Sequence, residues 1–168
     1  MYKRILLAYD GTREGLVALR EGALLAKRCG AEVHLLSVLP ETAGVLMASA
    51  SGGDVVGQQV DTYRALLDRG ITVLKQLDLT PVGKLVIGEP APQIAAYATE
   101  AGTDLIVLGH RHHSTVSRWF SDSTSTYIRD HVPCSVLMGC NSITDEEFQA
   151  ELKGDLAPWP EATVSAPS

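Results

Sequence analysis

Short apolar segments recur through the first 140 residues of the chain, and most of them do not alternate with polar residues. A strand with one face in water alternates, so a continuous apolar run indicates a strand covered on both faces, as in a parallel sheet between layers of helices. Five segments fit this description: Lys3–Tyr9, Glu32–Val38, Gly83–Ile87, Asp104–Leu108 and Ser135–Met138.

The segments between these runs repeat apolar residues every three or four positions, which is typical of helices with one buried face. The repeats are Leu16, Leu19, Ala23 and Ala26 before Gly30; Val60, Tyr63, Leu67 and Leu74; and Ile94, Tyr97, Ala98 and Ala101 between Pro90 and Gly102. A fourth helix is expected to begin near Ser121–Ser123 and to end before Pro133.

Five strands that alternate with four helices predict an α/β domain with an open, doubly wound parallel sheet and helices on both faces. We expect the strand order 3-2-1-4-5, which reverses between the first and the fourth strand. Ligands of such sheets bind beyond the carboxyl ends of the strands at the reversal. The candidate crevice is therefore flanked by Tyr9–Thr12 and by Gly109–His112.

The periodic segments stop near Cys140, which divides the chain into a domain of residues 1–140 and an acidic extension of residues 141–168. Within the extension, Thr144–Lys153 fits one short helix. The remainder is rich in proline and has too few apolar residues for a core of its own. Trp159 is the expected anchor of this segment on the rest of the protein.

Charge and composition narrow the range of partners. The net charge is −6, and residues 140–168 hold six acidic residues against one lysine, so the main body is nearly neutral. This balance argues against nucleic acid as a partner. No apolar run approaches the roughly 20 residues of a membrane span, and the first residues lack the apolar core of a secretory signal. We therefore expect a cytoplasmic protein without a membrane partner.

Several familiar site motifs are absent from the sequence. The three cysteines have no C-x-x-C spacing, which argues against a disulfide framework or a zinc knuckle. There is no G-x-x-x-x-G-K-[ST], no G-x-G-x-x-G after the first strand and no G-x-S-x-G elbow. The chain also has Gly88–Glu89, not an acceptor aspartate, where a response receiver would carry its phosphate.

Five fragments in order resemble the universal stress protein family, and the resemblance covers residues 3–139. The fragments are RILLAYDGT at Arg4–Thr12, AEVHLLSV at Ala31–Val38, GEPAPQI at Gly88–Ile94, DLIVLGHR at Asp104–Arg111 and HVPCSVL at His131–Leu137. The resemblance implies a Rossmann-like fold of the adenine nucleotide alpha hydrolase type. It also implies a crevice for ATP or another adenine nucleotide, with Mg²⁺ accompanying the phosphates.

The ATP-binding branch of that family carries Gly, two residues, Gly, nine residues, Gly and then Ser or Thr after the fourth strand. On this chain the positions fall on Gly109, His112, Asp122 and Ser123, so two of the three glycines are missing. Glycines let backbone N–H groups approach phosphate oxygens closely. A carboxylate at a helix N-terminus competes with an anion for the same donors. The sequence therefore predicts weak or absent ATP binding.

The nucleotide residues that the resemblance implies come from both sides of the crevice. Asp10 is expected near the nucleoside, although a helix cap or turn is an equal reading of its place before Gly11–Thr12. Arg111, His113 and Arg118 offer positive charge in place of the lost backbone donors. The complete set is Ala8, Asp10, Val38, Gly109, Arg111, His112, His113, Ser123 and Thr124.

Other candidate features have simpler interpretations. His110, His112 and His113 are adjacent on a loop and favour solvated side chains, although a metal-responsive binder is an alternative hypothesis. Trp119 and Phe120 are interpreted as packing anchors. Residues Met47–Asp54 fit a surface loop, or a lid over the crevice.

The favoured hypothesis is a non-enzymatic universal stress protein that acts through protein partners the sequence does not name. The resemblance implies a homodimer that forms through the last strand, Cys134–Met138, which is an apolar edge. Slow ATP hydrolysis in the same crevice is the alternative. A further hypothesis is that the acidic tail folds over the crevice or a neighbouring subunit and places a carboxylate near Arg111 or Arg118.

Overall fold

The computed structural model describes residues 1–41, 55–109, 122–139 and 143–153, and its strands form one parallel sheet. The strand order is β3-β2-β1-β4-β5, as the sequence predicts. The strands are β1 (Arg4–Ala8), β2 (Glu32–Pro40), β3 (Val82–Gly88), β4 (Leu105–Gly109) and β5 (Ser135–Gly139).

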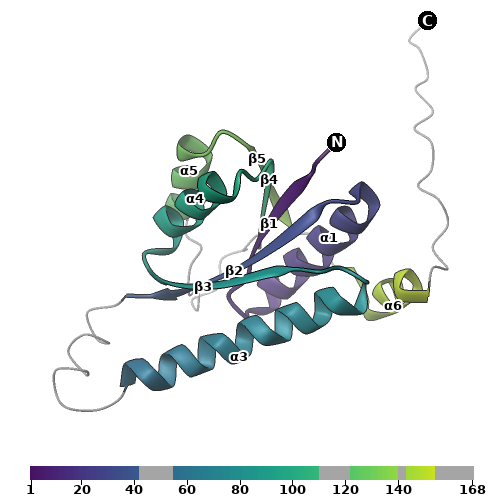
Figure 1. Ribbon diagram of the computed structural model, residues 1–168, viewed down its shortest axis with the longest axis horizontal. Coiled ribbons are helices and arrows are strands. Elements are labelled where there is room, and N and C mark those ends of the chain that lie inside the picture. The colour runs from purple at the N-terminus through teal and green to yellow at the C-terminus, as the bar shows by residue number, and fades with distance from the viewer. Residues whose placement is uncertain (42–54, 110–121, 140–142, 154–168) are drawn as a thin grey trace, which may run out of the picture.

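Helices cover both faces of the sheet (Figure 1). They are α1 (Arg13–Cys29), α3 (Val55–Gln76), α4 (Pro90–Ala101), α5 (Asp122–His131) and α6 (Asp145–Lys153). The helix α1 and most of α3 share one apolar core with the sheet, whereas α4 and α5 share another, to which Tyr63 near the start of α3 also contributes. The predicted elements are therefore confirmed, including the short helix in the extension.

Local signals explain where the first helix begins and ends. The hydroxyl of Thr12 accepts a hydrogen bond from the Gly15 N–H at 3.0 Å, which makes Thr12 the N-cap of α1. Gly30 follows the helix with φ of 60°, a left-handed conformation that glycine adopts without strain. Gly102 ends α4 in the same way, with φ of 61°.

The helix α6 lies outside the alternating α/β units and packs against α1. Thr144 and Glu147 form a reciprocal capping box at its start, with N–H···O distances of 2.8 and 3.1 Å. Phe148 is 3% exposed and joins the core under α1, and the Arg20 guanidinium lies 5.1 Å from its ring centroid. Phe148 is thus an anchor of the extension that the sequence analysis did not identify, whereas Trp159 lies outside the described residues.

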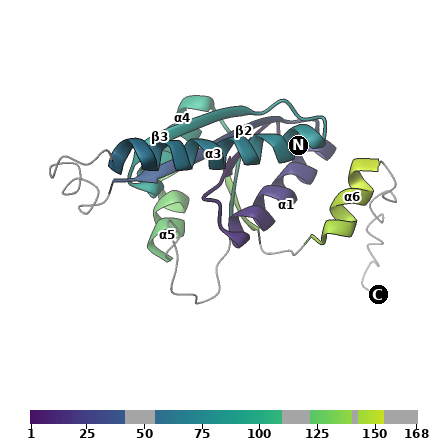
Figure 2. The same cartoon turned by 90° about the horizontal axis from the view of Figure 1, so that it is seen from below.

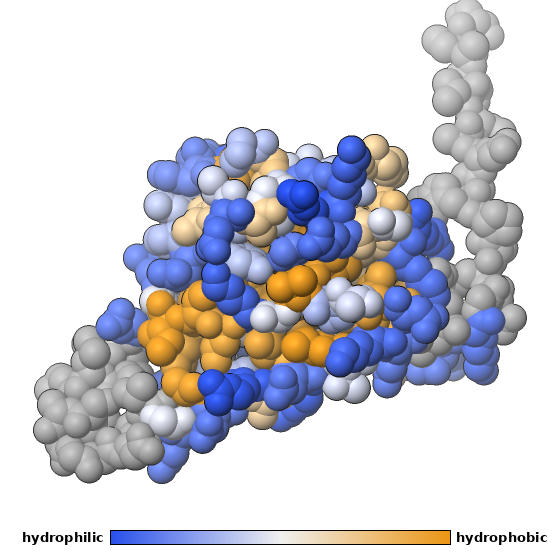
Figure 3. All heavy atoms as spheres, in the orientation of Figure 1, coloured by the Kyte–Doolittle hydropathy of each residue, from blue (hydrophilic) through white to orange (hydrophobic). Residues whose placement is uncertain are grey.

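The two outer strands of the sheet differ in their surroundings. β3 and β5 each pair with one neighbouring strand, and no described strand pairs with their outer edges. On β3, Val82 is 46% exposed and Ile87 is 51% exposed. Figure 3 shows apolar surface along this side of the molecule, over β3 and α3. The β3 edge is therefore an open strand edge with apolar neighbours.

Candidate functional site

The carboxyl ends of β1 and β4 meet the start of α1 at the point where the strand order reverses. The end of β4 and the side chain of Asp10 approach the first turn of α1 closely, because the residues at the points of contact are glycines. A β-carbon on Gly109 would lie 3.0 Å from the carbonyl carbon and oxygen of Glu14, and one on Gly15 would lie 2.5 Å from Asp10 Oδ1. Gly109 therefore allows the end of β4 to approach the first turn of α1, as a crevice between these strands requires.

Asp10 lies at this junction with its carboxylate turned back onto its own chain. It is 3% exposed, and its Oδ1 accepts hydrogen bonds from the Thr12 N–H at 3.0 Å and the Thr12 hydroxyl at 2.5 Å. The same hydroxyl caps α1. The structure therefore supports the turn-and-cap reading of Asp10, and any contact with a nucleoside would add to this role.

The side chains of Ala8 and Val38 are buried in the core beneath α4, so only the backbone groups of these two residues are available to a ligand. The Leu36 carbonyl accepts a hydrogen bond from the Tyr9 N–H at 2.9 Å. Backbone groups alternate in direction along a strand, so those of Val38 point to the same side as those of Leu36. Since β1 ends at Ala8 and β2 continues to Pro40, Val38 points past the end of β1.

A buried polar pair that the sequence analysis missed joins Ser37 of β2 to Tyr9, the residue after β1. Ser37 is fully buried, and its hydroxyl donates to the Tyr9 carbonyl at 2.8 Å. Burial raises the pKa of the Tyr9 phenol, and the nearby Arg69 guanidinium partly opposes this shift. Tyr9 therefore stays neutral at physiological pH. The position of Tyr9 directly after the first strand was the sequence signal that could have identified it.

The remaining predicted nucleotide residues belong to the segment between β4 and α5. Asp122 and Ser123 are the first two residues of α5, and Thr124 in its first turn is buried. His110, Arg111, His112, His113, Arg118, Trp119 and Phe120 lie outside the described residues, as does the predicted lid at Met47–Asp54. The structure thus brings together the nucleoside side of the predicted site, and the assignment of these residues to a ligand stays a prediction.

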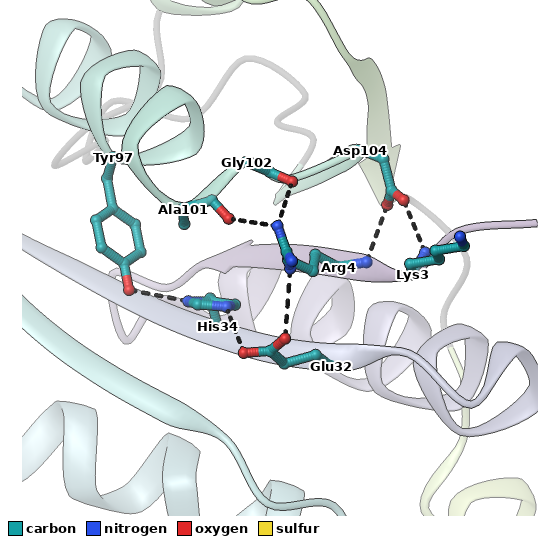
Figure 4. Close-up of polar contacts among 8 residues, drawn as sticks. All are labelled: Lys3, Arg4, Glu32, His34, Tyr97, Ala101, Gly102 and Asp104. Atoms are coloured by element: carbon teal, nitrogen blue, oxygen red, sulfur yellow. Dashed lines mark hydrogen bonds and ion pairs between the residues drawn. The ribbon is translucent and has the colours of Figure 1, made fainter.

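A second polar cluster lies at the amino ends of the strands, at the opposite edge of the sheet (Figure 4). The Asp104 carboxylate accepts hydrogen bonds from the Lys3 and Arg4 N–H groups at 2.7 and 3.1 Å. The Arg4 side chain reaches Glu32 at 3.4 Å and donates to the carbonyls of Ala101 and Gly102. These contacts join β1, β2, β4 and the end of α4.

His34 extends this cluster into the core. The residue is 8% exposed, with Nδ1 at 2.9 Å from the Tyr97 hydroxyl and Nε2 at 3.2 Å from Glu32. Burial raises the pKa of Tyr97, and the Lys84 ammonium, which lies 4.6 Å from the ring centroid, opposes the shift. Both ring nitrogens of His34 have protein partners, so this cluster is a structural tie between β2 and α4.

The described ranges contain neither a cluster of metal-ligating side chains nor a helix that could span a membrane. No three His, Cys, Asp or Glu side chains in those ranges come together in a way that could hold a metal ion. In the same ranges, every helix is too short or too polar to cross a bilayer. The histidine loop proposed as a metal site lies outside these ranges, so the alternative of a metal-responsive binder stays untested.

The strand order and the helices on both faces of the sheet define a doubly wound, Rossmann-like α/β domain. The chain belongs to the universal stress protein family, whose family model matches residues 1–138. Universal stress protein YxiE of Bacillus subtilis is 31% identical over 147 residues, which cover 82% of this chain and 99% of that protein.

Solved structures of the family share the architecture. A universal stress protein crystallised in complex with cAMP is similar with a TM-score of 0.64 and 19% identity, over 84% of this chain and 99% of that one. The universal stress protein from Archaeoglobus fulgidus in complex with dAMP is similar with a TM-score of 0.61 and 18% identity, over 82% and 97% of the two chains. At these identities the likeness shows the fold.

Proposed function

We propose that this chain is a cytoplasmic, non-enzymatic universal stress protein whose crevice binds the nucleoside part of an adenine nucleotide and holds its phosphates weakly. The observation that carries the proposal is the junction of Asp10, Gly15 and Gly109 at the reversal of the sheet. The complexes of two structural relatives with cAMP and dAMP support an adenine nucleotide with one phosphate.

The nucleoside end of the proposed site has suitable groups. The backbone of Val38 points past the end of β1, where an adenine ring could exchange hydrogen bonds with it. Ser37 and Tyr9 lie beside this position, and the Ser37 hydroxyl already donates to the Tyr9 carbonyl. The backbone groups of Val38 would recognise the base without requiring a phosphate.

The phosphate end fits a triphosphate poorly. The helix α5 opens on Asp122, so an acidic residue occupies the N-terminal turn that would face an anion. His112 replaces a second glycine of the family pattern. Asp10 Oδ1 already accepts two hydrogen bonds from Thr12, which gives this carboxylate a structural role at the turn.

Calorimetric titration with AMP and with Mg-ATP tests the proposal. The natural protein should bind AMP and ATP with affinities that agree within about threefold, because the phosphates contribute little. The double variant His112→Gly/Asp122→Gly should gain at least about tenfold in ATP affinity, and less in AMP affinity. Asp130→Asn is the matched control, since it removes one negative charge from the far end of the same helix.

Three outcomes would contradict the proposal. Binding of neither nucleotide by any variant would remove the crevice as an adenine site. Tight ATP binding by the natural protein would show that the missing glycines are replaced by other donors, with Arg111, His113 and Arg118 as the residues to test. ATP turnover above background that Asp10→Asn abolishes without unfolding would favour the enzyme alternative.

We propose in addition that the protein is a homodimer through β5 and transmits nucleotide occupancy to protein partners. In support, the outer edge of β5 has no partner among the described strands, and Val136, Leu137 and Met138 are half-buried. A second β5 would cover these side chains and pair the free backbone groups.

A further inference from the structure

The outer edge of β3 is open along a strand that carries large apolar side chains. Val82 and Ile87 stand near the two ends of β3 and are each about half exposed. Leu85 and Val86 between them are half-buried. Figure 3 shows that the apolar surface continues from β3 onto α3. Such an edge exposes unpaired N–H and C=O groups and favours pairing with another extended segment.

The usual protection of a strand edge is weak on β3. Lys84 is the only charged residue of the strand, and a lysine on an edge commonly discourages pairing. Here the Lys84 Nζ is held by Glu100 at 3.2 Å and lies over the Tyr97 ring of α4. The Lys84 ammonium is therefore directed toward α4. It does not protect the apolar side chains of the β3 edge from pairing with another strand.

The C-terminal helix ends beside the start of this strand. Both views place the end of α6 next to the turn between α3 and β3 (Figures 1 and 2). The helix is fixed there by the buried Phe148, which shares its core with Leu77 and Leu79 of that turn. Residues 154–168 thus start near Val82. Fully extended, they reach about 50 Å, whereas the seven residues of β3 span about 23 Å.

The sequence of residues 154–168 suits an edge strand. It contains the apolar residues Leu156, Trp159 and Val164 in a stretch that lies beyond the family match. Pro158 and Pro160 are two positions apart, so in an extended chain both turn their missing N–H groups to the same side. Proline is tolerated in an edge strand when that side faces solvent. The intervening Trp159 then directs its backbone toward the neighbouring strand.

We propose that residues 154–168 of the chain bind along the outer edge of β3, with Trp159 against Leu85 and Ile87, whose side chains project to the same face of the strand. The segment closes one edge of the sheet within the same molecule. It leaves the β5 edge free, so self-association is directed to β5 and edge-to-edge aggregation through β3 is suppressed.

Fluorescence of Trp159 tests this contact in the full chain. Trp119→Phe leaves Trp159 as the single tryptophan. Acrylamide should quench it at least about threefold more slowly than a free tryptophan amide, because the ring is covered. Adding Val82→Lys together with Ile87→Lys should bring quenching close to that of the free amide. Tyr127→Lys, at an exposed site on α5, is the matched control and should change nothing. Circular dichroism verifies that each variant is folded.

Other results would overturn the proposal. Quenching as fast as the free amide in the parent would show that Trp159 is not covered. Slow quenching that the β3 substitutions leave unchanged would place the segment elsewhere, such as over the crevice. Sedimentation that shows a dimer broken by the β3 substitutions, with Trp159 exposed throughout, would assign the edge to a second copy of the chain.

Discussion

Single residues at the two ends of the sheet have contrasting tasks. At the carboxyl end, Asp10 stabilises a turn and, through Thr12, the start of α1. At the amino end, His34 links Glu32 of its own strand to Tyr97 of α4. Both are buried polar residues with partners, as expected when desolvation is costly. Only the first lies where a ligand binds in sheets of this kind.

Ionisation of the Tyr97 hydroxyl should lower the free energy of unfolding at alkaline pH. Its pKa is raised by burial, so the folded protein holds this proton more tightly than the unfolded chain does. The resulting stability is fully present below the unfolded pKa of about 10 and is lost as pH rises through the folded pKa. Tyr97→Phe should lower the free energy of unfolding at pH 8 by about 1 kcal/mol, through loss of the hydrogen bond to His34.

Urea denaturation of both proteins at pH 8 and pH 11 measures this effect. The decline in stability between the two pH values should be smaller in Tyr97→Phe, and Tyr9 should account for part of the remainder because burial also raises its pKa. Tyr127→Phe is the control, since Tyr127 is exposed. Equal declines in the natural protein and Tyr97→Phe would show that the folded protein does not favour the neutral phenol.

Among the elements, α1 has a central place because β4, β5 and α6 all pack against it. Its first turn meets the end of β4 at Gly109, and a β-carbon on Gly139 of β5 would lie 2.8 Å from the Cα of Ala18. On another side, α6 inserts Phe148 beneath it. The junction at Gly109, the last strand and the extension therefore all pack against the same helix.

Docking of α6 should contribute measurably to stability. Phe148→Ala removes a buried ring and its contact with Arg20, and should lower the free energy of unfolding by about 3 kcal/mol. Phe148→Leu keeps most of the apolar volume and should cost less than about 1.5 kcal/mol. Urea denaturation followed by circular dichroism compares the three proteins. A loss below about 0.5 kcal/mol in Phe148→Ala would mean that α6 is not docked in solution.

On the scale of the whole molecule, the two edges of the sheet set how copies associate. The outer edges of β3 and β5 are both open among the described strands, but their proposed occupants differ. The proposed occupant of β3 is the end of the same chain, and that of β5 is a second copy. A domain with two unprotected edges would form open chains of molecules, whereas one closed edge limits assembly to a pair.

Analytical ultracentrifugation tests this division of roles. The natural protein should sediment as a dimer, and Met138→Lys should shift it to the monomer, because a charge on β5 opposes burial against a second copy. Ile87→Lys, the matching substitution on the other edge, should leave the dimer intact. A monomeric natural protein, or a dimer that resists Met138→Lys, would contradict assembly through β5.

Most of the fold could be predicted because its signals are local. Unbroken apolar runs gave the buried strands, and the glycines at positions 30 and 102 marked the helix ends before the left-handed conformations were known. The order of the sheet and the place of the crevice followed from general rules for alternating strands and helices. The site was less accessible: the contact of Asp10 with Thr12 shows its role in the turn, and its expected place near a nucleoside stays a prediction.

The amino-acid pattern was thus sufficient for the elements, the strand order and the family. Contacts between residues far apart in the sequence could be identified only in the folded structure. His34 and Tyr97 are 63 positions apart, and Phe148 near the end of the chain contacts Arg20 near its start. A local pattern records whether a residue is buried or exposed, but not which partner it meets. That choice depends on how the helices pack across the sheet, so the tie at the amino end, the docking of α6 and the close approach of Gly109 to α1 emerged from tertiary packing alone.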